Sequence, residues 1–170
     1  MKIVNIVCAG DLKQPISFDL VFNSRDNRFL YDPEMYHGGY VKLSNAKVTI
    51  YRSGKYIIVG VKSLEDIKSA FDELIVALSP YIDPDVVEEP RVSNIVALKN
   101  YGRKIDFSSL QEYFREYDID YEPEQFPGLI LHCKSCTALI FSTGKVIVTG
   151  AKTMSQLNEM FSFIDVVINK

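Results

Sequence analysis

The feature that most constrains this chain is an internal repeat. Residues 31–63 align without gaps with residues 121–153, and ten of these thirty-three positions are identical. About two identities are expected by chance from average residue usage. Upstream, the tripeptide that begins at Asn5 recurs at Asn94. We therefore predict two copies of one structural unit, residues 1–85 and 86–170, with pseudo-two-fold symmetry and a partner that is similarly two-sided.

The composition is that of a folded chain of modest size. Hydrophobic residues make up 47% of the 170 residues and charged residues 24%, which excludes general disorder and a large multidomain enzyme. The net charge of -3 argues against nucleic-acid binding, because domains with that role are usually basic. The three cysteines cannot all pair, no apolar run could span a membrane, and the N-terminus lacks a signal-peptide pattern. These features predict an intracellular protein.

Each copy has the pattern of a mixed α and β unit. The sequence predicts a strand, a short helix, a three-stranded antiparallel meander and a long helix, in that order. Gly54 and Gly144 lie in turns short enough for hairpins, where glycine supplies a positive φ. The predicted strands are 3–9, 40–43, 48–52 and 56–61, then 91–98, 129–132, 137–142 and 146–151, and the predicted short helices are 17–24 and 106–115.

Both long helices begin with a capping-box pattern, at Ser63 to Asp66 and at Thr153 to Gln156. Behind each cap, apolar residues recur at helical spacing, which predicts helices packed on one face of a sheet. These residues are Ile67, Phe71, Leu74, Ile75 and Leu78 in the first copy and Leu157, Phe161, Ile164 and Ile168 in the second.

The opposite face of the sheet has no predicted cover. Side chains alternate along a strand, so residues two apart share a face. One face is then mostly apolar, with amides, hydroxyls and lysines placed symmetrically, which predicts a binding platform rather than a catalytic pocket. Its members are Asn5, Val7, Thr49, Tyr51, Ser53, Lys55, Ile57 and Val59 in the first copy and Asn94, Val96, Leu139, Phe141, Thr143, Lys145, Ile147 and Thr149 in the second.

Neither an enzyme nor a metal site is predicted. The sequence has no phosphate-binding glycine loop, no HExxH-type pair and no Ser/His/Asp set. Cys133 and Cys136 lie next to His132, but a structural zinc site needs four ligands and the sequence has no second pair. We interpret the two thiols as part of a hairpin turn, and we expect no cofactor.

A longer string in the second copy is more specific than any single motif. It begins as YEPEQFPGLI at residues 121–130, continues as ALIF at 138–141 and TGK at 143–145, and ends as VTGAK at 148–152. Together with the repeat, this string resembles the second repeat of the TATA-box-binding protein core, and the first copy resembles its counterpart more loosely. The resemblance covers essentially the whole chain. The short N-terminus is similar to archaeal members, which implies a location in the cytoplasm or nucleoid; a eukaryotic member would be nuclear.

The resemblance implies an α+β saddle, with a ten-stranded curved antiparallel sheet and helices on its convex face. Members of this family are the usual example of proteins that bind the DNA minor groove, insert apolar wedges and bend the duplex. The implied roles are base-edge hydrogen bonding by Asn5, Asn94 and Thr149, apolar contact by Val7, Val96, Leu139 and Ile147, ring insertion by Phe126 and Phe141, and phosphate binding by Arg52, Lys55 and Lys145. The other expected contacts are Tyr36, Thr49, Tyr51, Ile57 and Val59.

The first copy departs from the family pattern on this face. Tyr36 and Tyr51 stand where the family has phenylalanine wedges, and an unsatisfied phenol between bases costs about 1–3 kcal/mol. Thr49 replaces a leucine, and Val59 replaces a threonine, which removes a hydrogen-bond donor. These changes predict weaker DNA engagement by the first copy than by the second.

The resemblance also implies protein partners. The loop with Glu122 and Glu124 is expected to contact transcription factor B, and RNA polymerase is then recruited. The predicted function is a general initiation factor that binds and bends AT-rich promoter DNA. The alternative is a diverged paralogue with weakened DNA binding that acts as a protein-interaction or regulatory module. Under the first function, the negative net charge averages a more basic DNA-facing surface with the acidic segments 83–89 and 118–124.

Overall fold

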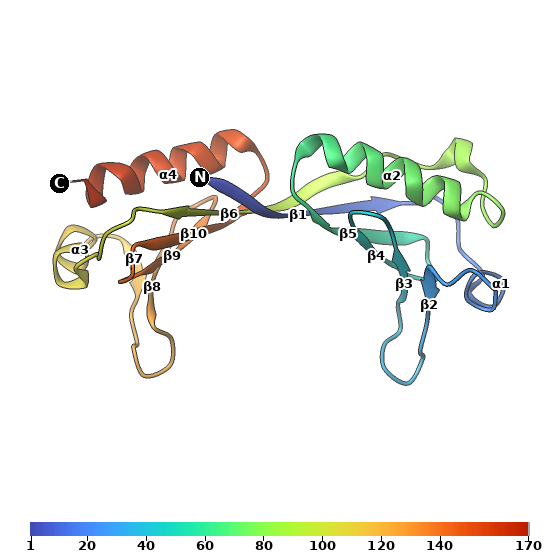
Figure 1. Ribbon diagram of the computed structural model, residues 1–170, viewed down its shortest axis with the longest axis horizontal. Coiled ribbons are helices and arrows are strands. Elements are labelled where there is room, and N and C mark those ends of the chain that lie inside the picture. The colour runs from blue at the N-terminus through green and yellow to red at the C-terminus, as the bar shows by residue number, and fades with distance from the viewer. Residues whose placement is uncertain (170) are drawn as a thin grey trace. The chain divides into compact units, whose positions relative to one another are not determined.

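The computed structural model describes residues 1–169, whose helices and strands are shown in Figure 1. The chain forms two compact units: residues 5–93 make one, and residues 1–4 join the segment from Asn94 onward to make the other. The elements are β1 (Lys2–Asp11), α1 (Phe18–Phe22), β2 (Phe29–Leu30), β3 (Gly39–Lys42), β4 (Lys47–Ile50), β5 (Lys55–Val61), α2 (Leu64–Leu78), the 3-10 helix η1 (Pro84–Val86), β6 (Arg91–Asn100), α3 (Phe107–Tyr113), β7 (Asp118–Asp120), β8 (Gly128–His132), β9 (Thr137–Phe141), β10 (Lys145–Ala151) and α4 (Met154–Ile168).

The ten strands have the order β2-β3-β4-β5-β1-β6-β10-β9-β8-β7. The meander predicted in each copy is confirmed, because β3 pairs with β4 and β4 with β5, as β8 does with β9 and β9 with β10, all antiparallel. The short helices are confirmed but shorter than predicted. The two-residue β2 and the three-residue β7 have no signal in the hydrophobic pattern, since they are too short to alternate.

Each unit covers one face of its strands with its long helix, α2 over β5 and α4 over β10 (Figure 1). In the first unit Leu74 and Leu78 of α2 are fully buried together with Ile58 of β5 and Cys8 of β1. Burial raises the pKa of the Cys8 thiol to about 11, so this thiol stays protonated and serves as a small apolar group. The stripe predicted for α4, Leu157, Phe161, Ile164 and Ile168, is buried as a whole, whereas in α2 Leu74 and Leu78 are buried and Ile67, Phe71 and Ile75 are only partly buried.

The two helix caps differ in one detail that the sequence pattern did not separate. Thr153 Oγ1 accepts a hydrogen bond from the Gln156 amide, and the Gln156 side chain accepts from the Thr153 amide in return. Ser63 Oγ accepts from the Asp66 amide at 3.1 Å, but no return bond forms. The prediction of a full capping box is thus wrong for α2, because the aspartate side chain is one methylene shorter than that of glutamine.

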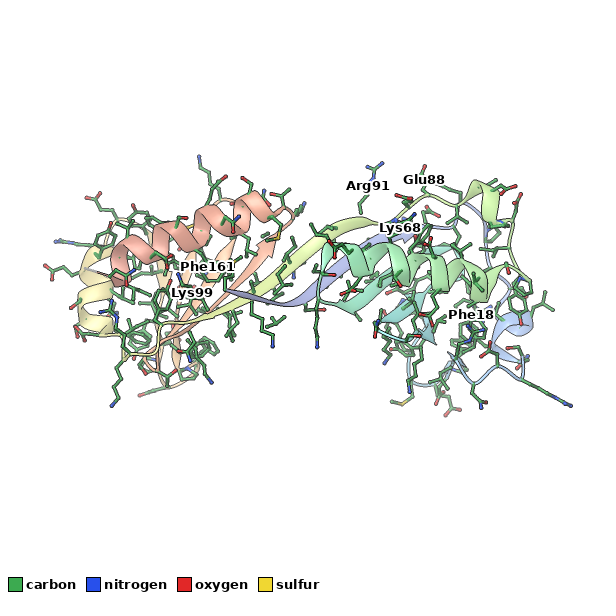
Figure 2. All side chains as sticks on the ribbon, turned by 45° about the horizontal axis from the view of Figure 1, so that its top comes forward. Phe18, Lys68, Glu88, Arg91, Lys99 and Phe161 are labelled. Atoms are coloured by element: carbon green, nitrogen blue, oxygen red, sulfur yellow. The ribbon has the colours of Figure 1, made fainter. Side chains whose placement is uncertain are left out.

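The cores of the two units are filled differently at one cross-strand pair. In the first unit Gly10 faces Tyr56, and a Cβ atom on Gly10 would lie 2.2 Å from the tyrosine ring. In the second unit the corresponding pair is Lys99 and Val146. Lys99 lies next to α4 (Figure 2), where its Nζ contacts Asp165 Oδ1 at 2.6 Å. A large aromatic side chain in one unit is therefore replaced by an ion pair in the other.

No helix within residues 1–169 combines the length and the apolar character that crossing a membrane requires.

The ion pair on α4 gives stability that depends on pH. Partial burial opposes ionisation of Asp165, but hydrogen bonds from Lys99 and Tyr101 outweigh it and lower the pKa of this carboxyl. A group with a lowered folded-state pKa stabilises the native state above its unfolded pKa, about 3.9, and this contribution is lost as the pH falls through the folded value.

We therefore expect Asp165→Asn to lower the free energy of unfolding by about 1–2 kcal/mol at pH 7, a range reduced for partial exposure. The difference from the wild type should shrink as the pH falls through the lowered pKa of the native carboxyl, because the wild-type side chain then also becomes neutral. Urea unfolding between pH 2.5 and pH 7 measures this, with Asp72→Asn at an exposed position of α2 as the control. A difference that is the same at every pH would contradict the assignment.

Candidate nucleic-acid interface

The strand faces opposite the long helices are not covered by any described element, and the residues predicted to share this platform do lie together. In the first unit Val59 is paired with Val7 and Ile57 with Thr49. In the second unit Leu139 is paired with Ile147. All are partly exposed, while their neighbours along each strand are buried, except Gly60 next to Val59. We call this surface the platform face of each unit.

In the second unit two phenylalanine rings meet at the edge of the platform face. Phe126 lies in the β7–β8 loop and Phe141 ends β9, and their ring centroids are 5.7 Å apart in an edge-to-face arrangement. The loop is tied by the Glu122 carbonyl, which accepts hydrogen bonds from the Gln125 and Phe126 amides. A Cβ atom on Gly128 would lie 2.7 Å from the Phe126 ring, so glycine makes room for the rings.

The first unit repeats this arrangement with two tyrosines. Tyr36 and Tyr51 have ring centroids 6.3 Å apart, and a Cβ atom on Gly38 would lie 2.8 Å from the Tyr36 ring. The two hydroxyl groups form a hydrogen bond of 2.9 Å with each other. This bond, with partial burial, raises the pKa of Tyr51, so the Tyr51 hydroxyl stays protonated at physiological pH. The expected cost of an unsatisfied phenol is therefore avoided, because each hydroxyl is the partner of the other.

The amide side chains near the start of β1 and β6 are held in one orientation. Gly60 and Gly150 have positive φ, +99° and +91°, and their N–H groups donate to Asn5 Oδ1 at 2.9 Å and to Asn94 Oδ1 at 2.7 Å. Because a backbone amide occupies each carboxamide oxygen, the Nδ2 groups are the donors that remain on the platform face. The family resemblance implies that the two asparagines are donors, but the sequence carries no signal for the glycines that orient them.

The two asparagines differ in the side chain that lies next to the Nδ2 group. In the second unit Asn94 Nδ2 lies 3.3 Å from Thr149 Oγ1, so the threonine hydroxyl and the amide form one hydrogen-bonded pair. In the first unit Val59 occupies the position of Thr149 and offers no hydroxyl. Among residues 1–169 no side chain is hydrogen-bonded to Asn5 Nδ2, which leaves this donor available.

The predicted cationic residues have different surroundings. Lys55 and Lys145 are exposed at the first positions of β5 and β10. Arg52 is stacked instead: its guanidinium carbon lies 4.6 Å from the centre of the Phe18 ring on α1. The guanidinium also approaches the Tyr31 hydroxyl at 3.5 Å, so aromatic contacts fix its position.

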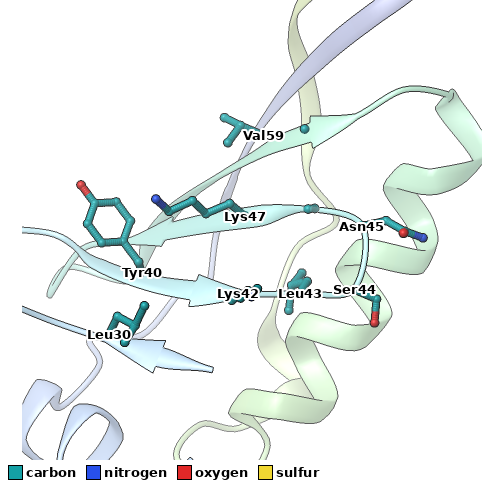
Figure 3. Close-up of a pocket in the computed structure, with 10 residues that line it drawn as sticks. Leu30, Tyr40, Lys42, Leu43, Ser44, Asn45, Lys47 and Val59 are labelled. Carbon is teal, nitrogen blue, oxygen red and sulfur yellow. The ribbon is translucent and has the colours of Figure 1, made fainter. Parts of the chain in front are cut away.

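Two lysines of the first unit belong to the platform face although sequence analysis did not include them. Lys42 and Lys47 face each other across β3 and β4, and Lys47 Nζ lies 4.4 Å from the centre of the Tyr40 ring. They border a shallow hollow of about 560 Å³ together with Leu30 and Val59 (Figure 3). The alternation that gives Thr49 its face also predicts Lys47, so the signal was present in the strand pattern.

The corresponding edge of the second unit has the opposite charge. Asp118 and Asp120 of β7 are exposed, and Asp120 Oδ2 lies 3.1 Å from His132 Nε2. The positive charge of the platform face is therefore concentrated in the first unit.

The β8–β9 turn contains Cys133, whose amide donates to the Cys136 carbonyl at 2.9 Å, so the two thiols lie in a hairpin turn as interpreted from the sequence.

The fold and this face are those of a DNA-binding transcription factor built from two repeats, and comparison with known proteins identifies the family. Residues 1–81 and 89–170 match the family model described as transcription factor TFIID, or TATA-binding protein. The chain therefore belongs to the TATA-binding protein family.

Relatives that match over nearly the whole chain support this membership. TATA-box-binding protein C of Halobacterium salinarum is 33% identical, covering 96% of this chain and 94% of the relative. The TATA-box-binding protein of Methanothermobacter thermautotrophicus is 36% identical, covering 90% and 86%. The solved structure of Methanococcus jannaschii TBP matches with a TM-score of 0.81 at 28% identity, covering 99% of this chain and 97% of that chain. These matches favour a general initiation factor over the diverged-paralogue alternative.

The asparagine contacts on the platform face lead to a test of the geometry. Asn94→Ala removes the acceptor of the Gly150 amide, and we expect it to lower the free energy of unfolding by about 1 kcal/mol. Asn94→Asp keeps an oxygen in the same place and should leave stability nearly unchanged. Amide hydrogen exchange of Gly150 checks the cause: the amide should lose protection in the alanine variant and keep it in the aspartate variant. Equal protection in both variants would refute the hydrogen bond.

Proposed function

We propose that this chain acts as the general transcription initiation factor of its family by placing its platform faces in the minor groove of AT-rich promoter DNA. The observation that supports the proposal best is that the same arrangement of functional side chains occurs in both units. Each unit holds an oriented asparagine donor, an apolar strand surface and a pair of aromatic rings. Two copies of a minor-groove reader suit a duplex, whose two strands are related by a two-fold axis. Each repeat, residues 1–85 and 86–170, would contact one half of the site.

The chemistry of the platform face fits the minor groove. An A·T pair presents only acceptors there, adenine N3 and thymine O2, whatever its orientation. A protein that reads such an edge needs donors, and Asn5, Asn94 and Thr149 supply them. The apolar side chains Val7, Val96, Leu139, Ile57 and Ile147 would contact the sugars and base edges. Thr49 adds a partly exposed hydroxyl on β4.

The aromatic pairs would act as wedges. Rings inserted between two base pairs unstack them, and the kinked duplex then contacts more protein surface. Phe126 with Phe141 forms one such pair and Tyr36 with Tyr51 the other. Lys55 and Lys145 would bind phosphates, with Arg52 at the end of the first platform face. Because apolar contact contributes much of the affinity, we expect a shallow dependence on salt concentration.

The proposal extends to partners. Glu122 and Glu124 are both exposed in the loop between β7 and β8. We propose that these carboxylates contact transcription factor B, through which RNA polymerase is recruited. Such a protein acts by binding DNA and protein partners rather than by catalysis, and it needs no cofactor. We propose that it acts inside the cell.

Asn94→Asp tests the minor-groove proposal directly. It replaces the Nδ2 donor by a charged acceptor that would face the acceptors of the A·T edge, while the Gly150 contact is retained. We expect its affinity for a duplex with an AT-rich box to fall at least tenfold at unchanged stability. A donor and an acceptor dye at the two ends of the duplex report binding and bending by energy transfer. If the wild type does not bend the duplex, alone or with transcription factor B, the proposed function is wrong.

The partner contact has a separate test. Glu122→Gln with Glu124→Gln removes two charges from a loop whose backbone turn is made by the Glu122 carbonyl and is retained. We expect DNA bending by the variant alone to be unchanged and the ternary complex with transcription factor B to weaken severalfold in a gel-shift titration. The matched control is Asp32→Asn with Glu34→Gln in the equivalent loop of the first repeat. An equal effect of both double variants would contradict a specific contact at the second repeat.

A further inference from the structure

The turn between β8 and β9 carries two cysteines that the corresponding turn between β3 and β4 lacks. Cys133 and Cys136 stand where the first repeat has Leu43 and Ala46. In both turns the amide of the first of these residues donates to the carbonyl of the second at 2.9 Å, so the backbone frame is the same. Both cysteines are free thiols. DNA binding as proposed above makes no use of them.

The strand register places the two cysteines directly opposite each other. The last pair of the ladder between β8 and β9 is His132 with Thr137. The pair that follows in the turn is therefore Cys133 with Cys136. Side chains alternate between the two faces, so both thiols lie on the side of buried Leu131, away from the platform face. The Cα atoms of a hydrogen-bonded pair are about 5.5 Å apart, a separation that a disulfide can span.

The two thiols differ in exposure and therefore in the order in which they react. Cys133 is partly exposed, whereas Cys136 is 3% exposed, and its sulfur lies 3.8 Å from the Gln156 carbonyl oxygen in the first turn of α4. Burial and the neighbouring Cys136 raise the pKa of the Cys133 thiol, so its protonated form predominates at neutral pH. The small thiolate fraction is a strong nucleophile, because nucleophilicity rises with the pKa of a thiol. An oxidant in solution reaches Cys133 first.

The same turn packs against the glycine that orients Asn94. A Cβ atom on Gly150 would lie 3.5 Å from both the Cys136 Cα atom and the Ser135 carbonyl oxygen. The Gly150 amide donates to Asn94 Oδ1 at 2.7 Å. The Cβ atoms of directly opposite residues are about 4.5–5.5 Å apart, whereas a disulfide holds them at about 3.8 Å. A disulfide in this turn therefore twists the backbone that contacts Gly150.

We propose that Cys133 and Cys136 are an oxidative modification site, at which a low-molecular-weight disulfide such as oxidised glutathione produces an intramolecular disulfide that weakens the hydrogen bond between Gly150 and Asn94. The Cys133 thiolate attacks one sulfur of the oxidant, which gives a mixed disulfide and releases one thiolate of the oxidant. Cys136 loses its proton and attacks the Cys133 sulfur, which releases the second thiolate. The two protein thiols are oxidised, and the oxidant is reduced to two thiols that take up the two protons.

The consequence for DNA rests on the proposed function, because Asn94 is one of the donors of the platform face. When this side chain loses its fixed orientation, we expect the affinity for an AT-rich duplex to fall about fivefold or more. By linkage, a bound duplex must disfavour the disulfide by the same factor. The first repeat, which has Leu43 and Ala46 in its turn, is not subject to this control.

The test exposes the full chain to mixtures of oxidised and reduced glutathione, then unfolds it and labels the remaining thiols with N-ethylmaleimide. Mass spectrometry should find three labels on the reduced protein and one, on Cys8, after oxidation, with the bond mapped between Cys133 and Cys136. Below the thiol pKa the rate of oxidation should rise about tenfold per pH unit, as the thiolate fraction does. Three labels at every glutathione ratio, a persistent mixed disulfide, or a bond to Cys8 or between two chains would refute the site.

Amide hydrogen exchange tests the coupling without DNA. We expect the Gly150 amide to exchange at least about threefold faster in the oxidised than in the reduced protein. The Gly60 amide of the first repeat should not change and is the internal control. Cys133→Ser cannot form the bond, and Cys133→Leu with Cys136→Ala copies the turn of the first repeat, so neither variant should respond to the oxidant. Equal exchange of Gly150 in both redox states of the wild type would refute the coupling.

The duplex with energy-transfer dyes distinguishes failure of this inference from failure of the proposed function. If the disulfide forms and Gly150 loses protection, but neither redox state bends the duplex, the proposed function is wrong and the modification site stands. If the reduced protein bends the duplex and oxidation leaves its affinity unchanged, the effect on DNA is refuted and the proposed function stands. The thiol count needs only the wild type, so a variant that folds poorly does not remove the test.

Discussion

The register of the hairpins between β4 and β5 and between β9 and β10 is the constraint on which both faces of the sheet depend. Gly54 and Gly144 adopt φ values of +91° and +93°, and a Cβ atom on either would lie 2.1 Å from a backbone carbonyl oxygen. A slip of one residue would move every core side chain to the platform face and every platform side chain to the core. The helix packing, the asparagine contacts and the ring pairs all depend on this register.

On this common frame the two repeats have diverged in ways that keep the backbone. The pair of Gly10 and Tyr56 in one core corresponds to Lys99 and Val146 in the other, so bulk on one strand is exchanged for bulk on its neighbour. The platform faces diverge as well, in ring chemistry, in the loss of the Thr149 hydroxyl at Val59, and in charge. The two repeats thus share a backbone frame but carry different side chains on their platform faces.

The net charge of -3 does not describe the surface that matters. Lysines 42, 47 and 55 lie on the platform face of the first repeat, whereas β7 places carboxylates at the matching edge of the second. The first repeat, which its substitutions marked as the weaker DNA binder, is therefore the more basic half. A whole-chain sum cannot reveal this, because it does not distinguish one strand face from the other.

The sequence by itself determined the duplication, the meanders, the long helices and most of the platform face, though not Lys42 and Lys47, because these features follow from periodicity and from glycine and capping positions along one strand or helix. It could not locate β2 and β7, which are too short for a pattern, or the missing half of the Ser63 cap. Only the tertiary structure decided how side chains distant in sequence meet. The bond between Tyr36 and Tyr51, the hold of Gly60 on Asn5, and the stacking of Arg52 on Phe18 each join residues from separate elements. Such contacts depend on packing geometry, which local sequence patterns do not encode.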